Sequence, residues 1–260
     1  MKTCFLVCCL CAVVMAFGAK PRVKNLNVVF IGNSITAGAL LQDATNECPP
    51  MRACEYLRQQ EGIGTVVCEN QGVSGQTTLD FLPAFGTRYP RVIAAADKLA
   101  ADKTALLVFS IMLGTNDSAI KGPNGAPVNP KQYQTNISVI VDHLLARYPD
   151  CRIVLHRPVW YSENTYNNAM YLKEGLERLK SYYPELQLLT EQYAVSHPGR
   201  VFPGDTEAFD YFRDHATELF NPERGNAGIF YLHPNKEGAA LLGEFWGKAM
   251  LKAIGWEAKG

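Results

Sequence analysis

The chain of 260 residues is electrically balanced and has an ordinary globular composition. It carries 25 basic and 25 acidic side chains, and hydrophobic residues make up 47% of it against 19% for charged ones. A balanced charge gives no global attraction to nucleic acid or to anionic lipid, so we expect neither as a partner. The length suffices for one large core, and we expect one domain over residues 20–260.

The first 19 residues have the pattern of a secretory signal peptide. Lys2 provides a positive start, Cys4–Phe17 is almost continuously apolar, and the small residues Gly18 and Ala19 follow. The apolar run is short of the ~20 residues that cross a bilayer, and no later segment approaches that length. We therefore expect cleavage of residues 1–19, export to the periplasm or the exterior, and no stable membrane insertion. An uncleaved anchor is the alternative.

Four of the 8 cysteines lie beyond this segment, at Cys48, Cys54, Cys68 and Cys151. In an exported protein these cysteines can form disulfides, and four cysteines allow three pairings. A small loop between Cys48 and Cys54 is conceivable, and buried thiols are the alternative. Neither the cysteines nor the histidines have the spacing of a metal site, so we expect no metal and no other cofactor.

Short apolar segments alternate with helix-like segments along the rest of the chain. The expected elements, in chain order, are a strand at Leu26–Ile31, a helix at Met51–Gln60, a strand at Thr65–Cys68, helical material at Leu79–Ala101 broken by Pro83 and Pro90, a strand at Ala105–Leu113, a helix at Pro130–Arg147, a strand at Arg152–His156, a helix at Tyr166–Tyr183, a strand at Leu186–Leu189 and a helix at Glu237–Ile254. This alternation predicts an α/β fold with a parallel sheet that helices cover on both faces. In such a sheet the ligand crevice lies beyond the carboxyl ends of the strands.

Four short segments place reactive or polar groups at those ends and in the last loop. Ser34 follows the first strand, Gly75 the second and Asn116 the third, while His233 precedes the last helix. A serine can attack an ester once a histidine takes its proton. The amides of Ser34 and Gly75 and the side chain of Asn116 can hold the oxyanion, and glycine lets its amide approach without a Cβ. These residues predict a hydrolase.

The segments GNSIT, NQGVSG, GTND and LHPN, in this order, resemble the four sequence blocks of the SGNH (GDSL-like) hydrolase family. The resemblance extends over residues 28–242. It implies a flavodoxin-like three-layer α/β/α sandwich with about five parallel strands and ester cleavage without a metal. It also implies Ser34 as the nucleophile, His233 as the base, and Gly75 and Asn116 as oxyanion donors. Many members of the family remove acetyl groups from carbohydrates.

Two positions depart from the family pattern. Asn33 stands where members usually carry Asp before the serine, and we expect little damage there because that residue is normally supportive. Phe230 stands three residues before His233, where the triad carboxylate normally lies. Glu223 and Asp205, both in the final loop, are the candidate replacements, and a backbone carbonyl is the alternative.

The segment after the fourth strand carries aromatic residues that suit sugar rings. Trp160 and Tyr161 offer flat apolar faces with polar tips, and together with Arg157 of the same segment they are the residues that we expect to bind the substrate. Packing within the protein is the alternative role. No long apolar channel for an acyl chain is visible, so we expect a secreted serine esterase that removes small acyl groups, acetyl above all, from a glycan or other small ester. A lipolytic esterase or thioesterase of the same fold and a catalytically decayed glycan-binding relative are the alternatives.

Overall fold

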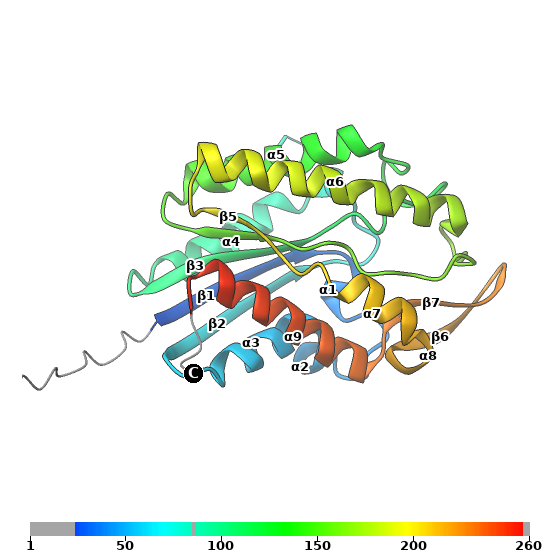
Figure 1. Ribbon diagram of the computed structural model, residues 1–260, viewed down its shortest axis with the longest axis horizontal. Coiled ribbons are helices and arrows are strands. Elements are labelled where there is room, and N and C mark those ends of the chain that lie inside the picture. The colour runs from blue at the N-terminus through cyan, green and yellow to red at the C-terminus, as the bar shows by residue number, and fades with distance from the viewer. Residues whose placement is uncertain (1–23, 85–86, 257–260) are drawn as a thin grey trace, which may run out of the picture.

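A five-stranded parallel sheet forms the centre of the protein, which a computed structural model describes over residues 24–84 and 87–256 (Figure 1). Its strands are β1 (Lys24–Gly32), β2 (Ile63–Gly72), β3 (Ala105–Met112), β4 (Arg152–Leu155) and β5 (Val201–Pro203). They lie in the order β2-β1-β3-β4-β5, and every neighbouring pair is parallel. The predicted α/β fold is confirmed. The predicted signal peptide lies outside the described residues.

Helices cover both faces of the sheet (Figure 1). One layer contains α4 (Tyr89–Ala100), α5 (Pro130–Arg147) and α6 (Leu172–Ser196), and the other contains α3 (Pro49–Arg58) and α9 (Lys236–Ala253). The alternation of side chains along β1 divides the core accordingly. Val29 and Ile31 pack in the cluster with α4, α5 and α6, while Val28 and Phe30 pack in the cluster with α3 and α9.

Short elements extend beyond the carboxyl ends of the strands. They are the helices α1 (Ser34–Ala37), α2 (Ala44–Glu47), α7 (Ala208–Asp214) and α8 (Ala216–Leu219), the 3₁₀ turn η1 (Thr78–Phe81), and the strands β6 (Phe220–Gly225) and β7 (Gly228–Pro234). Strands β6 and β7 form an antiparallel hairpin that projects past this end of the sheet, at the right of Figure 1. The sequence pattern did not predict this hairpin.

The predicted fifth strand, Leu186–Leu189, is wrong, because this segment lies inside α6. Pro184 makes the segment resemble the start of a new element, since proline usually interrupts a helix. The helix nevertheless continues through Pro184, and Leu179, Leu186 and Leu189 are all buried on its sheet-facing side at helical spacing. The fifth strand of the sheet is the three-residue segment Val201–Pro203.

The packing of α3 on β2 determines the pairing of the cysteines, which the sequence left open. A disulfide joins Cys54 of α3 to Cys68 of β2, while Cys48 and Cys151 are buried free thiols. The small Cys48–Cys54 loop is therefore not formed.

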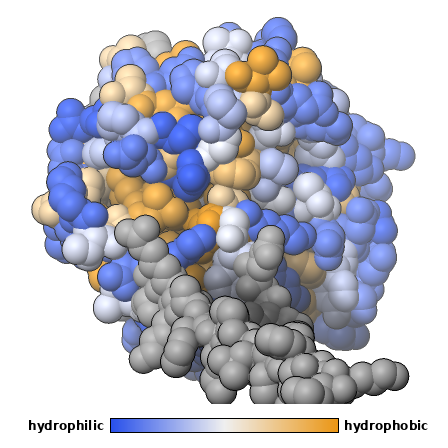
Figure 2. Space-filling view, turned by 60° about the vertical axis from the view of Figure 1, so that its left-hand side comes forward, coloured by the Kyte–Doolittle hydropathy of each residue, from blue (hydrophilic) through white to orange (hydrophobic). Residues whose placement is uncertain are grey.

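The surface in Figure 2 shows hydrophilic residues around areas of hydrophobic ones. Within residues 24–84 and 87–256, no helix has the length and apolar character that a membrane crossing needs.

Candidate active site

Ser34 lies at the carboxyl end of β1, as the first residue of α1. The preceding Asn33 caps this helix, because its Oδ1 accepts a hydrogen bond from the amide of Ile35 at 3.0 Å. The first amides of a helix have no hydrogen-bond partner within the helix, so the Ser34 N–H is not used by a hydrogen bond inside α1. Asparagine thus performs the capping that an aspartate would perform here, in agreement with the supportive role expected for Asn33.

The β6–β7 hairpin brings His233 to this serine. The His233 Nε2 lies 2.9 Å from the Ser34 Oγ, although the two residues are 199 positions apart in the sequence. On the other side of the ring, Nδ1 lies 2.9 and 3.0 Å from the two carboxylate oxygens of Glu223. The Glu223 Oε1 also accepts a hydrogen bond from the backbone amide of His233 at 3.1 Å. Ser34, His233 and Glu223 therefore form one continuous hydrogen-bonded chain.

The strand register of the hairpin explains how the carboxylate reaches the histidine. Glu223 on β6 pairs with Phe230 on β7, the position at which the family pattern would place an acid. Phe230 is buried in the core. The carboxylate thus comes from the strand opposite that position. Asp205 lies elsewhere, since its carboxylate accepts hydrogen bonds from the amides of Glu207 and Ala208 at the start of α7.

The partners of His233 also determine its tautomer. A carboxylate only accepts hydrogen bonds, so Nδ1 must carry the proton that faces Glu223. In the neutral ring, Nε2 is then an acceptor, and it can take the hydroxyl proton of Ser34. This is the arrangement that a general base requires.

A second serine–histidine pair, Ser110 and His156, has the opposite arrangement. The Ser110 Oγ lies 2.9 Å from the His156 Nε2, but the Asp205 amide donates to the His156 Nδ1 at 3.0 Å. Nδ1 is therefore the acceptor, and Nε2 donates its proton to Ser110. Both side chains are at most 2% exposed, and burial lowers the pKa of His156 to about 3. This pair lies in the core, against Trp246, and its histidine nitrogen cannot take the serine proton.

The predicted oxyanion donors follow the two strands that flank β1. Gly75 lies in the turn after β2, with a φ of 77° that favours glycine. A Cβ there would meet no protein atom within 4 Å, so the left-handed backbone, and not crowding, explains the glycine. Asn116 lies in the loop after β3 and is buried. Because β1 is hydrogen-bonded to both β2 and β3 and all three are parallel, the residues after these strands lie at the same edge of the sheet as Ser34.

Hydrogen bonds fix the side chain of Asn116 and its loop. The Asn116 Nδ2 donates to the Gln76 carbonyl at 2.8 Å, and its Oδ1 accepts from the Tyr171 hydroxyl at 2.7 Å. The next residue, Asp117, accepts hydrogen bonds from the amide and the hydroxyl of Thr78, which ties the loop after β3 to the one after β2. Burial raises the pKa of Asp117 to about 6. Nothing in the sequence pattern singled out Tyr171 or Thr78.

The three residues predicted to bind substrate occupy different surroundings. Tyr161 is 0% exposed, and its hydroxyl is hydrogen-bonded to the Ser118 Oγ at 2.8 Å, so it packs inside the protein and cannot contact a substrate. Trp160 is partly exposed and makes an edge-to-face contact with Phe220 at the start of β6, with the ring centroids 5.9 Å apart. Of the two aromatic side chains, only Trp160 has surface exposed to solvent, and it lies beside the β6–β7 hairpin.

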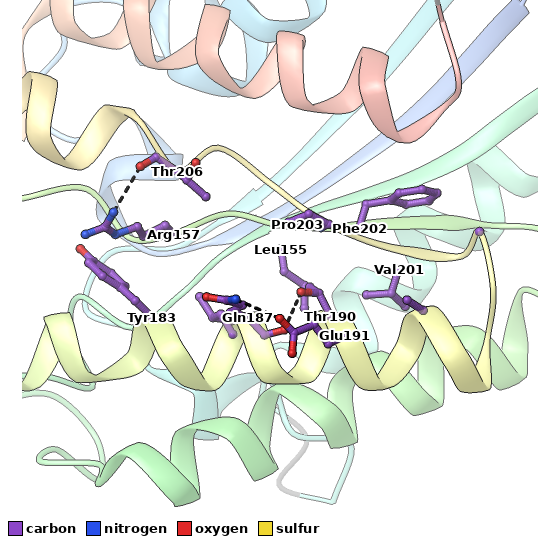
Figure 3. Close-up of a pocket in the computed structure, with 13 residues that line it drawn as sticks. Leu155, Arg157, Tyr183, Gln187, Thr190, Glu191, Val201, Phe202, Pro203 and Thr206 are labelled. Atoms are coloured by element: carbon purple, nitrogen blue, oxygen red, sulfur yellow. Dashed lines mark hydrogen bonds between the residues drawn. The ribbon is translucent and has the colours of Figure 1, made fainter.

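Arg157 lines a separate groove between α6 and β5 (Figure 3). Its guanidinium lies over the ring of Tyr183, 3.4 Å from the centroid, and donates to the Thr206 carbonyl at 3.2 Å. The groove has a volume of about 670 Å³ and is lined mainly by residues of α6 and β5, both apolar and polar. Neither Ser34 nor His233 lines it. Arg157 thus lines a groove that does not include the Ser34–His233 pair, and its predicted role in substrate binding stays a prediction.

Residues 30–241 match the GDSL-like Lipase/Acylhydrolase family, which is most of the chain. The chain belongs to this family of ester hydrolases. No curated protein matches it. Among solved structures it resembles a catalytic mutant of an acetylxylan esterase from Geobacillus stearothermophilus, with a TM-score of 0.58, 18% identity and coverage of 92% of this chain and 99% of the other. It also resembles a carbohydrate acetylesterase from Sinorhizobium meliloti, with a TM-score of 0.57, 18% identity and coverage of 88% and 99%.

A third similar structure is the aryl esterase of M. smegmatis, with a TM-score of 0.59, 15% identity and coverage of 88% of this chain and 99% of the other. At these identities the similarity establishes a shared fold. The three solved structures thus share the fold of this chain over almost their entire length.

Proposed function

We propose that the protein is a serine esterase in which Ser34, His233 and Glu223 form the catalytic triad. The observation that carries the proposal is the hydrogen-bonded chain from the Ser34 Oγ through both ring nitrogens of His233 to the Glu223 carboxylate. In each hydrogen bond of this chain, the donor and the acceptor are placed as abstraction of the serine proton requires. Glu223 takes the place of the missing family aspartate, which removes the main argument for a decayed site.

The proposed reaction has two steps with one covalent intermediate. His233 takes the Ser34 proton while Oγ attacks the ester carbonyl, and the imidazolium that forms is stabilised by Glu223. The negative charge that develops on the carbonyl oxygen is held by the amides of Ser34 and Gly75 and by the Asn116 Nδ2. His233 then protonates the leaving alcohol. A water molecule, deprotonated by the same ring, hydrolyses the acyl-enzyme and restores Ser34.

We infer that the substrate carries a small acyl group, acetyl above all, on a carbohydrate. Two of the similar structures are described as an acetylxylan esterase and a carbohydrate acetylesterase, which favours this class by analogy of fold. Trp160, partly exposed and packed against Phe220 of the hairpin that carries His233, offers an aromatic face for a sugar ring. The signal-peptide pattern of residues 1–19 favours export of such an enzyme to a location outside the cytoplasm, where polymeric glycans occur.

The test compares hydrolysis of aryl acetate, butyrate and octanoate by the wild-type protein, Ser34→Ala and Ser110→Ala. We expect acetate to be preferred, Ser34→Ala to lose at least about 10³-fold in kcat, and Ser110→Ala to stay within about threefold of wild type. Ser110→Ala is the matched control because it removes the hydroxyl of the other serine–histidine pair.

Release of acetate from acetylated oligosaccharides, with Trp160→Ala beside the wild type, then tests the sugar. Activity that survives Ser34→Ala would refute the triad. A preference for octanoate would refute the small-acyl substrate and leave the triad intact.

A further inference from the structure

Tyr171 contacts Asn116, one of the donors of the proposed oxyanion hole. It lies in the segment between β4 and α6, is 3% exposed, and donates its hydroxyl proton to the Asn116 Oδ1 at 2.7 Å. This contact joins residues 55 positions apart, and it places a residue of the β4–α6 segment against the loop after β3. No step of the proposed reaction uses Tyr171 directly.

The phenol is held in place by its own backbone and surroundings. The Tyr171 amide donates to the Thr165 carbonyl at 3.1 Å, and its carbonyl accepts from the Gly175 amide at 2.8 Å in the first turn of α6. Its ring also makes an edge contact with the ring of Tyr161 at 5.3 Å. The hydroxyl therefore approaches Asn116 from a fixed direction.

An asparagine amide can rotate by 180° and exchange its oxygen and nitrogen, so its orientation depends on its partners. In this site both hydrogen-bond partners of Asn116 favour the same orientation of its amide. A phenol proton faces Oδ1, and the Gln76 carbonyl accepts from Nδ2. The opposite orientation would place Nδ2 against the Tyr171 hydroxyl and Oδ1 against a carbonyl oxygen, which repel each other.

We propose that Tyr171 is a positioning residue for the oxyanion hole, where it holds the Asn116 amide so that the Nδ2–H not bonded to the Gln76 carbonyl faces the reacting ester. The proposal rests on the proposed function, because it assumes that Asn116 stabilises the oxyanion. The bond to Oδ1 also polarises the amide and strengthens its N–H donors, since hydrogen bonds in series reinforce one another. Without the hydroxyl, the amide keeps only the Gln76 carbonyl to orient it.

The test is Tyr171→Phe, which removes one oxygen and keeps the ring and its packing. We expect kcat for an aryl acetate to fall by about tenfold, less than the 10²–10³-fold that loss of a whole oxyanion donor produces, with KM within about twofold. The matched control is Tyr161→Phe. It removes an equally buried hydroxyl from the neighbouring ring, where the partner is Ser118 instead of Asn116. We expect kcat of this control to match wild type.

A double-mutant cycle with Asn116→Ala separates positioning from a general loss of stability. If Tyr171 acts through Asn116, adding Tyr171→Phe to Asn116→Ala leaves kcat of the single Asn116 variant unchanged. Equal kcat losses in Tyr171→Phe and Tyr161→Phe, or a further tenfold loss on the Asn116→Ala background, would overturn the proposal. Thermal unfolding followed by circular dichroism ensures that each variant is assayed while folded.

The outcome distinguishes this inference from the function on which it rests. If Ser34→Ala abolishes hydrolysis and Asn116→Ala lowers kcat strongly while Tyr171→Phe matches wild type, the triad and the oxyanion hole stand and only the role of Tyr171 is refuted. If Asn116→Ala has no effect, the oxyanion assignment itself fails.

Discussion

Replacing Glu223 by glutamine tests the relocated carboxylate with almost no change of shape. Both Glu223 oxygens lie within 3.0 Å of the His233 Nδ1, and Oε1 also accepts from the His233 amide at 3.1 Å. Glutamine keeps one oxygen that can accept a hydrogen bond from His233, but it removes the negative charge. Its N–H₂ group replaces the second oxygen and can donate a hydrogen bond to the His233 Nδ1. The histidine then favours the tautomer with its proton on Nε2, where it cannot accept from Ser34.

The size of the effect follows from the charge pair. When His233 becomes an imidazolium, its charge lies about 4 Å from that of the carboxylate, an attraction of about 4 kcal/mol at an effective dielectric constant of about 20. That energy corresponds to about 10³-fold in rate. With the unfavourable tautomer added, the loss approaches the ~10⁴-fold seen when a triad aspartate becomes asparagine. We therefore expect kcat of Glu223→Gln to fall by about 10³- to 10⁴-fold.

The assay is the initial rate of aryl acetate hydrolysis at pH 7.5, with Asp205→Asn as the matched control. Asparagine can still accept from the amides of Glu207 and Ala208, so this variant keeps the start of α7 and removes only a carboxylate charge. We expect its kcat to stay within about threefold of wild type. If Glu223→Gln retains more than about a tenth of the wild-type kcat, the triad reasoning is refuted.

Two predictions concern stability. Burial lowers the pKa of His156 to about 3 and keeps the ring neutral in the folded protein, whereas the same side chain in the unfolded chain binds a proton below about pH 6.5. Lowering the pH from 7 to 4 should therefore reduce the free energy of unfolding by about 3 kcal/mol more in the wild type than in His156→Gln, as measured by urea titration. Parallel pH dependences of the two proteins would contradict this. The Cys54–Cys68 disulfide closes a loop with a sequence separation of 14, so the double Cys→Ser variant should lose about 3 kcal/mol of unfolding free energy while kcat is unchanged. Identical urea midpoints would refute the stabilising role.

The sequence alone indicated the site residues that lie in short local blocks, and three of these residues follow strands of the sheet. Ser34, Gly75 and Asn116 each follow a strand, and parallel strands deliver their carboxyl ends to one edge, so local patterns suffice to bring them together. Glu223 required the register of a hairpin whose strands the sequence pattern did not reveal. Its choice over Asp205 depends on the pairing of Glu223 with Phe230, which is a contact between strands and leaves no local signal.

The sequence by itself determined the α/β fold and the serine, histidine, glycine and asparagine of the candidate site, because alternating apolar segments and short blocks at strand ends are local properties of the chain. Only the tertiary structure decided which carboxylate meets His233, which serine faces a basic histidine nitrogen, and which buried phenol orients Asn116. It also decided that Leu186–Leu189 is helical and that Cys54 pairs with Cys68. These facts depend on contacts between distant segments, whose energies are set by packing and hydrogen-bond direction and not by the order of neighbouring residues.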